Sequence, residues 1–113
     1  MSERLPTHLL VAALIRRAGE EGGFATVLAR GDREAGAILL VCSERGAPPI
    51  FLERGIGPDG KVQLLRSGPR EPVESVEADA YWQRRRARDP DLWVIELDIA
   101  DSERFAAVTL LPI

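Results

Sequence analysis

The stretch of sequence that decides the fold is Asp89-Pro90-Asp91-Leu92-Trp93-Val94-Ile95-Glu96. A residue that precedes proline is pushed out of right-handed helical geometry, so Asp89-Pro90 stops any helix that comes before it. From Leu92 to Ile99 the odd positions are apolar, while Glu96 and Asp98 alternate with them, which predicts a strand with one buried face. The stretch therefore marks the boundary between a helix and a core strand.

Two helical patterns precede this boundary. Thr7 to Glu21 repeats apolar residues at a spacing of about one helical turn, and the Thr7 hydroxyl is suited to cap the first amides. The second pattern runs from Ser75, a suitable cap, to Arg88, with acidic residues near its start and arginines at its end. That polarity complements the helix dipole, so we expect two helices.

The first strands are predicted between these helices. Phe24 to Ala29 is apolar and β-branched, and the turn residues Gly31 to Gly36 that follow predict a hairpin with the next strand. That strand, Ala37 to Cys42, is apolar at every position, which is typical of a central strand covered on both faces.

A second antiparallel hairpin is predicted from Ile50 to Glu53 and Val62 to Arg66, which flank turn residues at positions 57–60. The C-terminal run Phe105 to Leu111 is predicted to be either a final edge strand or a partly ordered tail.

Length and composition bound the fold class. With 113 residues, of which 45% are hydrophobic and 29% charged, we expect one α+β domain over residues 1–113. Its core lies at about residues 7–99, and residues 100–113 form the edge strand or tail. The predicted architecture is a mostly antiparallel sheet of four to six strands covered by two helices.

Charge and cysteine usage exclude several classes of protein. A formal net charge of -3 makes nucleic acid an unlikely partner. The single Cys42 lies in an apolar run, so we expect a buried thiol in a reducing cytoplasm, without a disulfide or a cysteine-ligated metal. We expect no membrane association, because no apolar run is long enough for a signal or a span. We also expect no cofactor.

Three segments carry a family resemblance: Ala13 to Arg17, Arg30-Gly31-Asp32 with Ala35-Gly36, and Asp89 to Val94 followed by Glu96. Together they resemble the small bacterial proteins grouped as domain of unknown function 1491, over about residues 8–98. The resemblance implies a small cytoplasmic bacterial protein and carries over no catalytic residue.

The second helix predicts a partner-binding surface at Tyr81, Trp82, Arg85 and Arg88. Adjacent aromatic residues on a helix cannot both point inward, so one of the pair is expected to be exposed or at an interface. Exposed aromatic residues beside arginines are typical of binding hot spots. The preferred interpretation is therefore a non-enzymatic protein-interaction module with a protein partner whose identity the sequence does not give.

Two alternatives stay open. If the first helix packs over the final strand, Arg16 and Arg17 could meet Asp89, Asp91 and Glu96 in a pocket that serves a small anionic ligand or an enzyme, or in a structural ion-pair network. The other alternative is a homodimer in which the Phe105 to Leu111 edge strand pairs across a symmetry axis.

Overall fold

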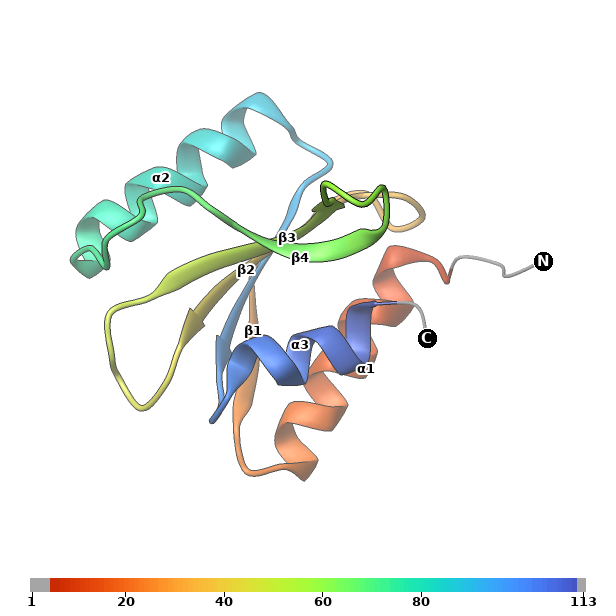
Figure 1. The fold of residues 1–113 in the computed structure, drawn as a ribbon, viewed down its shortest axis with the longest axis horizontal. Coiled ribbons are helices and arrows are strands. Elements are labelled where there is room, and N and C mark those ends of the chain that lie inside the picture. Colours follow the sequence, from red (N-terminus) through yellow and green to blue (C-terminus); the bar gives the residue numbers. More distant parts are fainter. Residues whose placement is uncertain (1–4, 112–113) are drawn as a thin grey trace.

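A central five-stranded sheet lies between helices on both of its faces (Figure 1). The computed structural model describes residues 5–111, so residues 1–4 and 112–113 of the predicted domain lie outside the described residues. The α+β class and the sheet size are confirmed. The elements are α1 (Thr7–Glu20), β1 (Phe24–Ala29), β2 (Ile38–Ser43), β3 (Ile50–Ile56), β4 (Val62–Ser67), α2 (Ser75–Arg88), β5 (Trp93–Asp98) and α3 (Ser102–Leu110).

The strand order is β1-β5-β2-β3-β4. The β2–β5 pair is parallel and the other three pairs are antiparallel. β4 and β5 are not neighbours, but they run in the same direction, and α2 is the crossover that connects them. The predicted β3–β4 hairpin is confirmed. The predicted β1–β2 hairpin is wrong, because β5 lies between these strands. β5 and β2 are almost entirely buried and therefore take the centre, whereas the half-exposed β1 takes the edge.

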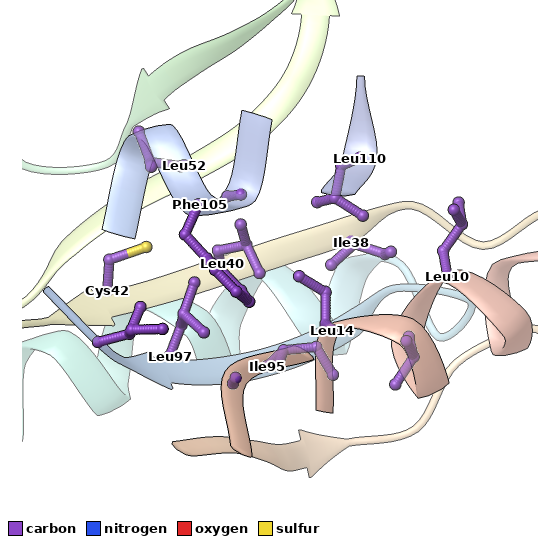
Figure 2. Packing of buried hydrophobic residues seen from close by; sticks show 14 of the residues in the cluster. Leu10, Leu14, Ile38, Leu40, Cys42, Leu52, Ile95, Leu97, Phe105 and Leu110 are labelled. Carbon is purple, nitrogen blue, oxygen red and sulfur yellow. The ribbon is translucent and has the colours of Figure 1, made fainter. Parts of the chain in front are cut away.

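Helices α1 and α3 cover one face of the sheet. Their apolar side chains interdigitate with those of β2 and β5 in the larger core cluster, part of which Figure 2 shows. Cys42 is buried in this cluster as predicted, and burial raises the pKa of its thiol to about 12. The contributions of the two helices are Leu10, Val11, Leu14, Ala18, Phe105, Ala106 and Leu110.

Helix α2 covers part of the opposite face, where it packs on Leu39, Phe51, Leu92 and Val94. The prediction that β5 buries one face is therefore too narrow, since Val94 is fully buried beneath α2. Within β5 only Glu96 is exposed, because α2 does not extend over it.

The C-terminal run is a helix, so the predicted edge strand or tail is wrong, and the described residues contain three helices rather than two. Phe105, Ala106 and Leu110 recur at helical spacing on one buried face of α3, and packing against α1 and the sheet selects that period. A homodimer through an edge strand at Phe105 to Leu111 is excluded with it.

The start of α1 is capped by the β1–β2 loop. The amides of Thr7 and His8 donate to the carbonyl oxygens of Glu34 and Arg33 at 3.1 and 2.9 Å. The Thr7 hydroxyl donates to the Gly36 carbonyl oxygen at 2.7 Å and makes no cap hydrogen bond of its own, so its predicted capping role is wrong. Thr7 instead ties the loop to the helix.

Candidate functional site

A groove of about 530 Å³ opens at the carboxyl ends of the parallel strands β2 and β5, on the α2 face of the sheet. Crevices at this end of parallel strands are the usual ligand sites of open α/β sheets. Its lining comes from four separated parts of the chain: Val41, Ser43, Gly46, Ala47, Pro48, Pro49, Pro72, Val73, Glu74, Ser75, Glu77, Ala78, Asp79 and Glu96.

The sheet forms the floor of this acidic groove. Val41 and Glu96 are register partners in the β2–β5 pair and therefore point to the same face. Val41 is buried and Glu96 is exposed. The floor of the groove is therefore apolar at Val41 and acidic at Glu96.

The β2–β3 loop forms one wall. Arg45 and Gly46 adopt left-handed backbone conformations, with φ of 53° and 79°. The Arg45 amide donates to Asp98 Oδ1 at 3.0 Å, which fixes the loop to the end of β5. Pro48 and Pro49 follow with restricted φ angles, so this wall is held in one shape before any ligand arrives.

The first turns of α2 form the other wall. Glu74 is the N-cap residue and gives no side-chain cap hydrogen bond, and Ser75 is already helical, so the predicted Ser75 cap is wrong. Glu77 lies in the first turn, where a carboxylate complements the helix dipole. Asp79 Oδ1 accepts a hydrogen bond from the Trp82 indole at 3.1 Å.

The lining carries a single sign of charge. Glu74, Glu77, Asp79 and Glu96 contribute carboxylates, and the lining contains no lysine, arginine or histidine. A cleft lined by one sign of charge concentrates groups of the opposite sign. The groove is therefore chemically suited to cations.

The predicted partner-binding residues of α2 mostly face the sheet. Ala78, Tyr81, Trp82 and Arg85 follow helical spacing, and both aromatic side chains are half-buried against the core. Neither aromatic side chain is fully exposed, so that part of the expectation is wrong, and a contact with a partner stays a prediction. Arg88 is exposed at the helix end.

Arg85 is held by an internal ion pair. Its Nη1 and Nη2 donate to Glu53 Oε2 and Oε1 of β3 at 2.7 and 2.9 Å, and Nη1 also lies 2.8 Å from the Tyr81 hydroxyl. The Tyr81 ring packs on Phe51 at a centroid distance of 4.5 Å. These contacts clamp α2 to the sheet.

The ion pair between Glu53 and Arg85 shifts the pKa of both side chains. Burial alone would raise the pKa of the Glu53 carboxyl, but the hydrogen bonds and the charge of Arg85 hold that pKa below its usual value. The hydrogen bonds to Glu53 raise the pKa of Arg85. Both groups are therefore charged at neutral pH.

The predicted ligand-binding residues do not converge. Arg16 and Arg17 pair with Glu20 and Glu21 of their own helix at 3.6 and 3.4 Å. Helix α1 covers the face of the sheet opposite to Glu96. Arg17 also lines a small cavity of about 140 Å³ beside α3, and its guanidinium lies 5.8 Å from the centroid of the Phe105 ring.

Asp89 and Asp91 lie in the turn between α2 and β5. Asp89 Oδ1 accepts the Asp91 amide at 3.1 Å, and the Asp91 carbonyl oxygen accepts the Asp32 amide at 3.0 Å. These contacts organise the turn.

Sequence reasoning missed the acidic groove. The sequence indicates only that the acidic residues near the start of α2 complement the helix dipole, which does not place them in a groove. The available signal was the run of acidic residues at the start of α2, but its convergence with Glu96 depends on the strand order.

Within residues 5–111, no group of three or more histidine, cysteine, aspartate or glutamate side chains is placed to hold a metal ion. Over the same part of the chain, no helix is both long and apolar enough to span a membrane.

Comparison with known proteins places the chain in a family. The model of a family described as protein of unknown function, DUF1491, matches residues 5–107. A crystal structure of a DUF1491 family protein from Caulobacter crescentus CB15 has 36% identity and a TM-score of 0.75, over 90% of this chain and 94% of that one. An NMR structure of a DUF1491 family protein from the same organism has 34% identity and a TM-score of 0.77, over 98% and 97%.

A solution structure of a protein from A. tumefaciens has 28% identity and a TM-score of 0.69, over 96% of this chain and 93% of that one. No curated protein matches the chain. The family match covers nearly the whole described fold, and it includes α1, the β1–β2 loop and the turn before β5. This chain therefore belongs to the DUF1491 family.

Proposed function

We propose that this protein is a non-enzymatic interaction module whose acidic groove binds a basic, extended segment of a partner protein. The observation that carries the proposal is the lining itself. Four carboxylates, from Glu74, Glu77, Asp79 and Glu96, border one concave surface that has no basic side chain to neutralise them. Such a surface attracts and orients a positively charged segment.

The apolar part of the lining suits the same partner. Val41, Pro48, Pro49, Val73 and Ala78 line the groove beside the carboxylates. Lysine and arginine side chains have an apolar stem and a charged head. The stem can pack on the apolar lining while the head contacts a carboxylate. A volume of about 530 Å³ is in the range of clefts that enclose a small ligand, and it accommodates a few side chains rather than a folded domain.

The walls are held in place before binding. The Arg45 amide to Asp98 hydrogen bond fixes the loop wall, and the Glu53–Arg85 clamp fixes α2. A site that needs little ordering loses less free energy on association.

Binding is better supported than catalysis at this groove. Ser43 and Ser75 are its hydroxyl side chains, and the lining holds no histidine, cysteine or lysine that could pair with them as a base or nucleophile. The exposed Arg88 keeps the C-terminal end of α2 as a second predicted contact. The Arg85 guanidinium is already engaged, because it donates to Glu53 and to the Tyr81 hydroxyl.

The test is a selection of displayed random 12-residue peptides on the wild-type protein, followed by titration of the selected peptides against two double variants. Glu77→Gln with Glu96→Gln removes two groove carboxylates. Glu34→Gln with Glu103→Gln removes two exposed carboxylates outside the groove lining and keeps the net charge matched.

We expect the selection to enrich arginine and lysine next to apolar residues. We also expect the groove variant to bind these peptides about tenfold or more weakly, because each lost contact to a cation contributes about 0.5–1.5 kcal/mol. The control variant should bind like the wild type. Peptides without basic enrichment, or equal weakening in both variants, would refute the proposal.

A further inference from the structure

The strand β1 forms one edge of the sheet, and the irregularity between Val27 and Ala29 leaves its first part, Phe24 to Val27, regular. It pairs with β5 on one side and ends the strand order. Its sequence, Phe-Ala-Thr-Val-Leu-Ala, contains no charge, no proline and no glycine. Natural edge strands normally carry such residues, because an unguarded row of amides and carbonyls accepts another strand. The other edge strand, β4, contains Arg66.

An aromatic side chain stands exposed beside this edge. Phe24 is 72% exposed, and it shares the α2 face with the exposed Thr26, since these residues are register partners of Asp98 and Glu96. A strand added to β1 would cover one side of the Phe24 ring with its own side chains and would pair the edge amides in the same step.

The charges at the two ends of β1 identify the added strand. Glu20 and Glu21 end α1 just before β1, and Arg30 follows β1 directly. When two copies of this strand pair antiparallel, the acidic end of each copy meets the basic end of the other. Parallel pairing would bring like charges together, so the charge pattern favours a second copy in antiparallel orientation.

The register follows from the regular part of the strand. Pairing with β5 shifts between Val27 and Ala29, which leaves Phe24 to Val27 as the regular segment. In a two-fold dimer each residue of the strand pairs with one on its own face of the sheet, so Phe24 pairs with Thr26 of a second copy and Ala25 with Ala25. This register brings Arg30 toward the end of β1 at which Glu20 and Glu21 of that copy lie. Because this contact is the same for both copies, it closes as a two-fold dimer.

We propose that the β1 edge is a homodimer interface, in which two copies join their sheets across Phe24 to Val27. None of Phe24 to Val27 lines the acidic groove, so the dimer does not rest on the proposed function. Glu20 and Glu21 are available to it, because their ion pairs with Arg16 and Arg17 are solvent-exposed.

The test is sedimentation velocity of the full chain at low salt over a range of concentrations, with charge-reversal variants. Wild type should show a monomer–dimer equilibrium. Arg30→Glu should weaken the dimer about tenfold, because two symmetric contacts become repulsive. Combining it with Glu20→Arg and Glu21→Arg should restore the dimer, and Arg88→Glu, at an exposed arginine elsewhere, should leave it unchanged.

The restoring variant separates dimer contacts from folding, since the Arg30 guanidinium also lies 5.8 Å from the centroid of the Trp93 ring within its own chain. Amide exchange gives a second readout, in which Phe24 to Val27 should become more protected as the dimer forms. A monomer at every concentration would overturn the proposal. So would a dimer that is insensitive to Arg30→Glu, a failure of the restoring variant, or unchanged β1 exchange in the dimer.

Discussion

The indole nitrogen of Trp93 donates a hydrogen bond to the backbone carbonyl oxygen of Asp32 across 2.7 Å. This contact joins the start of β5 to the β1–β2 loop. The Asp32 amide donates to the Asp91 carbonyl oxygen at 3.0 Å, and the Trp93 amide donates to the Ala37 carbonyl oxygen at 2.8 Å. Two of the segments that carry the family resemblance, Arg30-Gly31-Asp32 and Asp89 to Val94, are therefore in contact. These hydrogen bonds give both segments a structural role.

Trp93→Phe removes the indole donor and leaves the Asp32 carbonyl oxygen without this partner. We expect a loss of about 2–3 kcal/mol in the free energy of unfolding, measured by urea denaturation. Trp82→Phe is the matched control, because its indole bonds the exposed Asp79 carboxylate and water can replace it. Equal losses in the two variants would show that the Trp93 bond has no special structural role.

Gly36→Ala places a methyl group against the backbone carbonyl oxygens of Asp91 and Asp32, which cannot yield without moving the loop. We expect a destabilisation of about 1–3 kcal/mol in thermal unfolding. Gly19→Ala is the control, since its added methyl group meets nothing within 4 Å on the exposed side of α1. That substitution should stabilise the helix by about 0.5–1 kcal/mol. A neutral Gly36→Ala variant would contradict the close packing.

The Glu53–Arg85 clamp predicts a pH dependence. The folded-state pKa of Glu53 is lowered, so its contribution to stability is present above the unfolded value of about 4.3 and is lost as the pH falls through the folded value. Glu53→Gln should therefore lower the free energy of unfolding at pH 7 by about 1–3 kcal/mol. In urea denaturation at a series of pH values, the variant should also lose less of this free energy than the wild type as the pH falls below about 5. The exposed Glu34→Gln is the control, and an equal loss on acidification in Glu53→Gln and the wild type would disprove the assignment.

Cys42 should be unreactive in the folded protein. Burial raises its pKa to about 12, so almost no thiolate is present at pH 8. We expect modification by a water-soluble disulfide reagent to be slower than for a model thiol by at least about a hundredfold, and to become fast in urea. Fast labelling of the native protein would show that the core around β2 opens readily.

The local elements could be predicted from the sequence because their signals are local. The end of α2 at Asp89-Pro90 follows from backbone preferences of adjacent residues, and the buried β2 follows from an uninterrupted apolar run. The C-terminal run Phe105 to Leu111 was ambiguous, because a short apolar segment fits both the helical and the strand period. Contact with α1 and the sheet selected the helix.

The sequence by itself determined the α+β class, most element boundaries, the central place of β2 and the burial of Cys42. Tertiary structure alone decided that β5 separates β1 from β2, that Arg85 binds both Glu53 and Tyr81, and that Glu96 joins three carboxylates at the start of α2 in one groove. The physical reason is that strand order and helix placement depend on which apolar faces can be buried together. That competition is settled between residues far apart in the chain, where local preferences carry no information.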